Sequence, residues 1–164
     1  MSLPEAIVAQ APDAIIYVDR DGAVVVWNQA AERLFGWTAA EMAASGLDAI
    51  IPERFQRAHW DGFQKAIDTG VTKYNAKVLT TRSMHKDGST MYVDLSFGLL
   101  RDDAGKVLGA MAMARDCTAR YLAERDLRAR MSTLQGQSGA AQGAAGAAQT
   151  PSGAVKTPSG AVQT

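Results

Sequence analysis

Several features that would commit the chain to a particular chemistry are missing from its 164 residues. Cys117 is the single cysteine, so neither an internal disulfide nor a multi-cysteine zinc or iron–sulfur site can form. Lys plus Arg and Asp plus Glu each number 17, and this zero net charge lacks the basic excess typical of nucleic-acid binders. The sequence also has no glycine-rich phosphate loop and no plausible catalytic triad.

The sequence likewise lacks the features of an export or membrane segment. Its first residues show no basic stretch followed by an apolar run, so we expect no signal peptide. No apolar run approaches the roughly 20 residues that a membrane-spanning helix needs. We therefore expect a cytoplasmic protein of one domain that contacts neither membranes nor nucleic acid.

The composition changes sharply at Gly136. Residues 136–164 contain one charged side chain, Lys156, and no aromatic residue, and they include a direct repeat that begins at Thr150 and again at Thr157. Such a segment cannot bury enough apolar surface to offset its chain entropy. This predicts a disordered tail rich in Ala, Gly, Ser and Pro; a tether or partner-binding motif is the alternative.

The first half of the remaining chain has the pattern of a hairpin followed by helices. Residues 14–18 and 23–27 are β-rich runs joined by a turn at residues 19–22. Asn28 is a suitable cap for a helix that ends at Gly36, and residues 38–41 form a capping box for another. Pro52 then begins a longer helix that ends near Gly70.

The second half favours strands and a final helix. We expect strands over residues 74–81, 90–100 and 107–114, separated by turns rich in Asp and Gly. Residues 118–135 have apolar positions spaced for an amphipathic helix, which suits a short coiled coil and a homodimer. This order predicts an α+β fold, with a five-stranded antiparallel sheet and helices on one face. A ligand cavity is expected between the longer helix and the last three strands.

The order and several motifs together resemble those of PAS domains. The matching segments are Pro12-Asp13-Ala14-Ile15, Asp19-Arg20-Asp21-Gly22, residues 28–37, Glu41, Pro52-Glu53-Arg54, Lys86-Asp87-Gly88 and Arg115-Asp116-Cys117-Thr118. The resemblance covers about residues 5–130 and implies a PAS domain over residues 1–117, followed by a signalling helix over 118–135 and the tail. PAS domains sense ligands, light or redox state, so the fold alone does not define the function. Cys117 lies outside the expected pocket and does not match a flavin-adduct cysteine.

His59 is the site residue that the pattern selects. On a helix, Phe55, His59 and Phe63 are four residues apart and share one face, which Ile67 extends. An imidazole facing an apolar cavity is a common haem ligand, whereas a half-buried histidine bonded to a carbonyl is the ordinary alternative. His85, beside a turn, is interpreted as a solvated loop residue.

The resemblance extends to haem-binding PAS domains of the FixL and direct oxygen sensor types. In those domains the proximal histidine lies seven residues after a helix-opening proline, which is the spacing from Pro52 to His59. The resemblance implies haem b with His59 as the iron ligand, and Lys65 and Lys73 as partners of the haem propionates. Surface lysines are the alternative interpretation.

The sequence departs from that type at one position. Where FixL-type domains place an oxygen-stabilising arginine, this chain has Leu79. The expected distal wall is therefore apolar, which weakens oxygen binding and leaves other diatomic gases or redox sensing. Its expected members are Leu79, Val93, Leu95 and Phe97, with Met111 or Met113; a bulge would instead bring in Lys77 or Arg82.

Three functions remain open at this stage. The first is a haem-binding sensor of a diatomic gas or redox state in signal transduction, acting on an effector protein in trans. The second is a haem enzyme that acts on peroxide or a small organic substrate, although the distal wall offers no acid–base side chain. The third is a haem-free PAS module that binds a ligand or dimerises.

Overall fold

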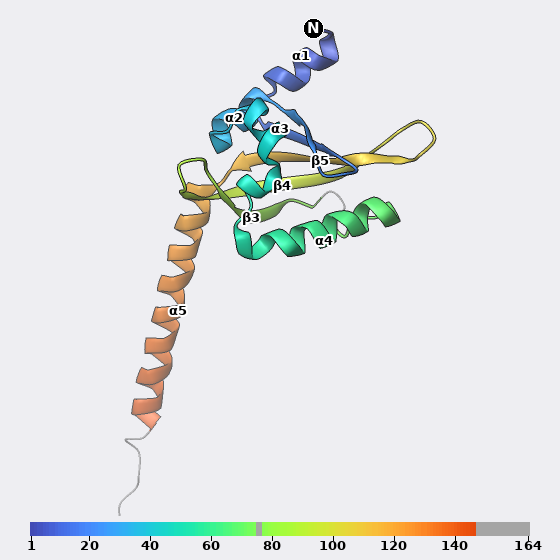
Figure 1. Ribbon diagram of the computed structural model, residues 1–164. Helices are drawn as coiled ribbons and strands as arrows, with labels where there is room; N and C mark the ends of the chain where they lie inside the picture. The colour runs from blue at the N-terminus through green and yellow to red at the C-terminus, as the bar shows by residue number, and fades with distance from the viewer. Residues whose placement is uncertain (75–76, 147–164) are drawn as a thin grey trace, which may run out of the picture. The chain divides into compact units, whose positions relative to one another are not determined.

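A computed structural model describes residues 1–74 and 77–146 and contains the predicted five-stranded antiparallel sheet (Figure 1). The strand order is β2-β1-β5-β4-β3, and each neighbouring pair is antiparallel. The strands are β1 (Ala14–Asp19), β2 (Val24–Trp27), β3 (Leu79–Met84), β4 (Thr90–Arg101) and β5 (Val107–Asp116). The helices are α1 (Leu3–Gln10), α2 (Gln29–Phe35), α3 (Ala39–Ser45), α4 (Glu53–Thr69) and α5 (Thr118–Gly146), with a 3₁₀ turn η1 (Leu47–Ala49).

The helix boundaries predicted from capping residues are confirmed. The Asn28 side chain accepts a hydrogen bond from the Ala31 amide at the start of α2, and Gly36 ends that helix in the left-handed region at φ 79°. Thr38 opens α3 with a complete capping box. Gly70 ends α4 at φ 67°. These local signals were sufficient because a cap satisfies the free backbone groups of a helix end directly.

Two elements of the domain differ from the prediction. The third strand begins at Leu79 instead of residue 74, because the Lys77 amide donates to the Tyr74 carbonyl (2.7 Å) and forms a turn. Residues 75 and 76 of the predicted strand lie outside the described residues. The helix α1 was not predicted, although Ser2 and Glu5 form the capping box that opens it.

The C-terminal helix continues past its predicted end. The α5 helix extends from Thr118 to Gly146, so the tail predicted to begin at residue 136 starts as helix. Residues 136–146 contain four Ala and two Gln, which are good helix formers, and four Gly, which disfavour a helix, so composition alone did not distinguish helix from coil. Residues 147–164 of the predicted tail lie outside the described residues. The chain forms two compact units, Met1–Tyr121 and Leu122–Thr164. None of the helices described here is long and apolar enough to span a bilayer.

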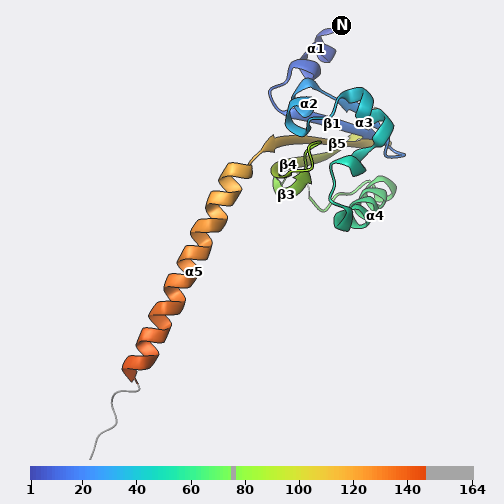
Figure 2. The ribbon, with the colours of Figure 1, turned by 60° about the vertical axis from the view of Figure 1, so that its left-hand side comes forward.

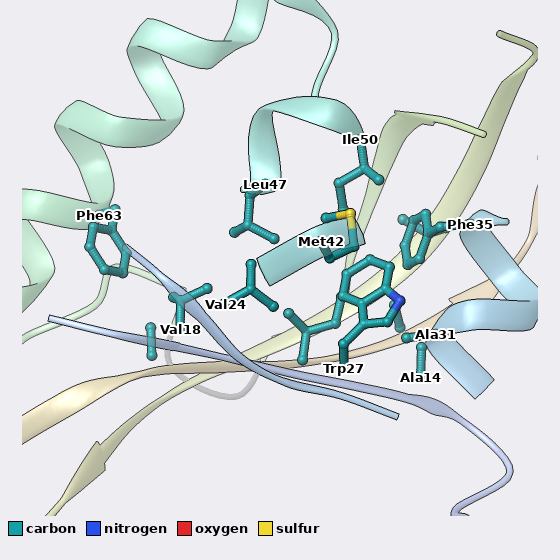
Figure 3. Packing of buried hydrophobic residues seen from close by; sticks show 14 of the residues in the cluster. Ala14, Val18, Val24, Trp27, Ala31, Phe35, Met42, Leu47, Ile50 and Phe63 are labelled. Carbon is teal, nitrogen blue, oxygen red and sulfur yellow. The ribbon is translucent and has the colours of Figure 1, made fainter. Parts of the chain in front are cut away.

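The core lies between the sheet and the helices of the first unit (Figure 3). Alternate positions of three strands point into it: Ala14, Ile16, Val18, Val93, Ala110 and Ala114. In Figure 3 the Met42 side chain of α3 lies between Ile50 and the Trp27 indole. The Trp27 and Phe35 rings contact each other at a centroid distance of 5.2 Å. This packing joins α2 and α3 to the β1–β2 edge of the sheet.

A buried amide connects the segments around that core. The Oδ1 atom of Asn28 accepts hydrogen bonds from the amides of Ile15 (2.9 Å) and Ala31 (3.0 Å). Its Nδ2 atom donates to the carbonyls of Val8 and Asp13, both at 3.0 Å. An asparagine amide has two donor hydrogens and two acceptor lone pairs, so every hydrogen-bonding position of this buried side chain is used.

We predict that Asn28→Ala destabilises the domain more than the loss of an ordinary helix cap. Thr38→Ala is the matched control, because it removes a cap at the exposed start of α3 and should cost about 1 kcal/mol. Asn28→Ala also leaves backbone groups of β1 and its flanking segments without partners, which adds at least about 1–3 kcal/mol. Urea unfolding of both variants measures the difference, and equal losses would contradict the prediction.

Candidate functional site

The α4 helix presents the predicted face of aromatic and aliphatic side chains. Phe63 and Ile67 are buried, and His59 is half-buried on the same face. Phe55, at the start of the helix, is 40% exposed, and the Arg54 guanidinium lies 4.6 Å from its ring centroid. Both ribbon views place α4 alongside β3 and β4 (Figure 1, Figure 2). The helix thus carries His59 toward the sheet.

Two adjoining cavities lie between α4 and the sheet. The first has a volume of about 380 Å³ and extends from α4 to β1 and β5. The second, about 610 Å³, lies against the C-terminal half of α4, residues 71–74, β3 and β4. His59 lines both cavities, and so do Phe63, Lys73, Tyr74 and Thr81. A ligand that filled both volumes would therefore contact the His59 side chain from either direction.

All ten residues predicted for the site line at least one of the two cavities. Those that line both are His59, Phe63, Lys73, Leu95 and Phe97. The first cavity alone includes Phe55, Val93 and Met111, and the second alone includes Lys65 and Leu79. The structure thus brings the predicted residues together, while their roles toward a ligand stay predictions.

The structure distinguishes between the residues that the sequence left as alternatives for the distal wall. Met111 lines the first cavity but is 36% exposed, because the inward positions of β5 are held by alanines. Met113 lines neither cavity. Of the two alternative cations, Arg82 lines the first cavity and Lys77 lines neither. The Arg82 Nη2 atom donates to the Thr90 hydroxyl at 2.9 Å.

Sequence reasoning missed five polar residues of the cavity walls. Tyr74 and Thr81 line both cavities, Ser83 lines the first, and Thr69 and Thr72 line the second. The alternation of β3 was the signal for Thr81, since it lies two residues after Leu79 on the same face of the strand. Tyr74 had no such signal in the sequence, because the predicted strand began at that residue whereas β3 begins at Leu79.

The His59 imidazole has an unusual environment. Its Nδ1 atom is buried and has no hydrogen-bond partner among the described residues. Burial lowers the pKa of His59 from its ordinary value, and the nearby Asp48 carboxylate opposes this effect. The Trp60 ring meets the imidazole edge-on, with the ring centroids 4.8 Å apart, and the indole nitrogen donates to Asp48 Oδ1 at 2.7 Å. The imidazole is therefore neutral near pH 7, the form in which it binds metals.

The walls of the cavities have a one-sided charge. Lys65, Lys73 and Arg82 contribute cations, and none of the described lining residues is an aspartate or glutamate. The ammonium group of Lys73 lies 4.9 Å from the centroid of the Tyr74 ring. The remaining lining is mainly apolar. This arrangement suits a largely apolar ligand that carries an acidic group.

The other histidine and the cysteine lie outside both cavities. The His85 Nδ1 atom is 3.1 Å from the Asp87 carboxylate in the turn between β3 and β4. Cys117 is buried where β5 meets α5, and burial together with the Asp94 carboxylate raises the pKa of its thiol. A flavin-adduct cysteine has to face the ligand, and Cys117 does not.

The strands of the cavity wall also hold the start of α5. The Asp94 carboxylate of β4 accepts hydrogen bonds from the Arg120 guanidinium (2.7 and 2.9 Å) and from the Thr80 hydroxyl of β3 (2.7 Å). The Tyr92 and Tyr121 rings stack at a centroid distance of 3.9 Å. Because side chains alternate along a strand, neighbours of these residues face the cavities. Strand β4 therefore contacts the cavities on one face and the first turn of α5 on the other, and β3 is linked to this contact through the hydrogen bond from Thr80 to Asp94.

The comparison with protein families agrees with this architecture. The model of the family described as the PAS fold matches residues 8–122, which is more than half of the chain. The chain therefore belongs to the PAS family of sensory domains in signalling proteins. The PAS domain of a protein from Colwellia psychrerythraea has a TM-score of 0.60 at 18% identity, covering 71% of this chain and 95% of that one. An RNA-binding light-oxygen-voltage receptor has a TM-score of 0.63 at 24% identity, covering 79% of this chain and 37% of the receptor.

The sequence relatives have a higher identity to this chain and are much longer than it is. The sensor protein FixL of Bradyrhizobium diazoefficiens is 29% identical over 99 residues, which is 53% of this chain and 17% of FixL. An uncharacterized protein of Azorhizobium caulinodans is 28% identical over 116 residues, covering 70% of this chain and 16% of that protein. The chain thus spans about a sixth of the length of these relatives.

We predict that His59 makes the stability of the haem-free domain depend on pH. Its pKa is lowered in the folded state, so the unfolded state, with the ordinary value of 6.5, takes up the proton first. The free energy of unfolding therefore falls as the pH drops below that value, by at most about 1.4 kcal/mol per pH unit. Urea unfolding between about pH 7.5 and about pH 5.5 measures this loss.

Two histidine variants isolate the contribution. His59→Gln should lose less stability over the same pH range than the unmodified domain. His85→Gln leaves His59 in place and should retain the steeper loss. Identical pH profiles for the unmodified domain and His59→Gln would contradict the prediction.

Proposed function

We propose that this PAS domain binds haem b, with His59 as the axial ligand of the iron, and senses a diatomic gas or a change of redox state. The observation that carries the proposal is the position of His59, a half-buried imidazole with an orphaned Nδ1 atom in the wall common to both cavities. A buried polar atom without a partner is uncommon in a folded protein. A ligand that bonds to this nitrogen supplies the partner that it lacks.

The donor set fits haem. The macrocycle is a large apolar group with two carboxylates, and the walls combine apolar side chains with Lys65 and Lys73. Neither lysine forms an ion pair with another described residue, so both are free to meet the carboxylates. When bound, haem supplies a redox-active iron with a coordination position for a small ligand.

The residues of this chain have separate tasks in the proposal. His59 holds the iron, and the two lysines orient the acidic edge. Leu79, Val93, Leu95 and Phe97 exclude water from the opposite wall. A shift of β3 and β4 on ligand binding moves Asp94 and Tyr92, which hold Arg120 and Tyr121 at the start of α5. An effector protein in trans, a further domain or a second copy of the chain then reads the change.

The comparisons support sensing and leave the ligand to be determined. FixL is named a sensor protein, and it is 29% identical to this chain over 99 residues. Two of the structural relatives are named light-oxygen-voltage proteins, and the location of Cys117 outside the cavities argues against adduct chemistry here. A haem enzyme is less well supported, since the described wall opposite α4 offers no histidine or carboxylate as an acid or base.

We predict that the purified domain, reconstituted with haem, has a Soret band that depends on His59. His59→Ala should lose stoichiometric haem binding while keeping its fold by circular dichroism, and added imidazole should restore a histidine-like spectrum. His85→Ala is the matched control and should bind haem normally. A wild-type domain without a Soret shift, or His59→Ala binding equally tightly, would show that the proposal is wrong and that the cavities take another ligand.

We also predict that Lys65 and Lys73 strengthen haem binding. Lys65→Met and Lys73→Met each remove an exposed charge, so the affinity should fall by roughly two- to fivefold per lysine at low salt. Lys106→Met, in the loop between β4 and β5, is the control for a change in overall charge. Titration with haem at low and high salt measures the effect, and equal affinities of all three variants would contradict it.

A further inference from the structure

The wall opposite α4 contains one hydroxyl that its surroundings leave unused. On β3, Leu79, Thr81 and Ser83 share the face that points to the cavities. Thr81 lines both cavities, and its partner across the sheet is Val93, also a lining residue. The lining residues around Thr81 include Leu79, Leu95 and Phe97, so its hydroxyl lies within a mainly apolar surface.

The other side-chain hydroxyls of β3 are engaged. The Ser83 hydroxyl donates to the Ile50 carbonyl at 2.7 Å, and the Thr80 hydroxyl, on the opposite face, donates to Asp94 at 2.7 Å. Among the described residues, none forms a hydrogen bond with the Thr81 side chain. Thr81 is exposed, so its hydroxyl meets water when the cavity is empty, and its donor hydrogen is available to a molecule in the cavity.

We propose that Thr81 determines ligand specificity by donating a hydrogen bond to a diatomic ligand held on the side of the haem opposite His59. The inference rests on the proposed haem binding and corrects the expectation that this wall is wholly apolar. A bound ligand that takes negative charge from the iron, such as oxygen, gains from a donor, whereas carbon monoxide takes less charge and gains less. A neutral hydroxyl gives a smaller preference than a guanidinium would.

Leu79 and Arg82 do not fill this role. Leu79 lines only the second cavity and has no donor atom. Arg82 lines only the first cavity, and its Nη2 atom donates to the Thr90 hydroxyl. Lys73 and Tyr74 line both cavities and carry donors, but they precede β3 and do not belong to this wall. Among the described residues of β3 and β4, Thr81 is the one that lines both cavities and carries a side-chain donor, so it is the donor that the geometry assigns to the ligand.

The test compares two neighbouring threonines on opposite faces of the same strand. Thr81→Val keeps the shape of the side chain and removes the hydroxyl, and Thr80→Val does the same on the face away from the cavities. Oxygen dissociation, followed by stopped flow, should be about two- to tenfold faster in Thr81→Val and unchanged in Thr80→Val. The infrared C–O stretch of the ferrous carbonyl complex should move to higher frequency in Thr81→Val alone.

A conservative variant and the Soret band separate the outcomes. Thr81→Ser retains a hydroxyl and should restore much of the slow oxygen dissociation. Unchanged kinetics and C–O frequency in Thr81→Val, with a normal Soret band, would overturn the role of Thr81 and leave haem binding intact. Equal effects of Thr80→Val and Thr81→Val would also overturn it. A wild-type domain that takes up no haem would overturn both proposals.

Discussion

The fold depends on the full use of one buried amide, that of Asn28. Its four hydrogen bonds determine where β2 stops and α2 begins, and they connect this point to α1 and to the start of β1. The end of α2 is in turn attached to the other edge of the sheet, since the Phe35 carbonyl accepts a hydrogen bond from the Lys86 amide (2.9 Å). The Ile50 carbonyl accepts from both the amide of Met84 and the hydroxyl of Ser83. The far wall of the cavities is thus positioned by a chain of bonds that begins at a helix cap.

The α4 helix is held to the rest of the domain by side-chain contacts, whereas α2 is held by hydrogen bonds at its two ends. Cavities separate much of α4 from the sheet, so contacts at its flanks hold it. Trp60 is one such contact, because its indole bonds to Asp48 and its ring lies where a side chain at Gly22 would have to be. Phe63 and Ile67 provide the apolar anchor. A helix held in this way can carry a ligand-binding side chain without filling the volume that the ligand needs.

Features that depend on a few neighbouring residues were predicted well from the sequence. Asn28, Thr38 and Gly70 mark helix ends by local hydrogen bonding, and the spacing from Phe55 to Phe63 determines which way His59 faces. The predicted start of β3 was wrong, because the segment at Tyr74 forms a turn although its composition also suits a strand. The sequence could not show that the Thr81 hydroxyl has no hydrogen-bond partner, because the partners of each threonine depend on how the strands are paired in the folded sheet. The helical start of the tail depended on the balance between alanine and glycine, which pattern alone does not settle.

The composition of the cavity walls has a consequence for metal selectivity. Their described residues include a single imidazole and no carboxylate or thiolate, and the described part of the chain contains no cluster of three or more metal-binding side chains. A bare zinc or copper ion, which would outcompete iron for a protein-built site, finds only one ligand here. Under the proposed function, iron enters already enclosed by the four nitrogens of the macrocycle. In that case the choice of metal is made when the cofactor is synthesised, and the protein recognises the organic frame and holds the enclosed iron through His59.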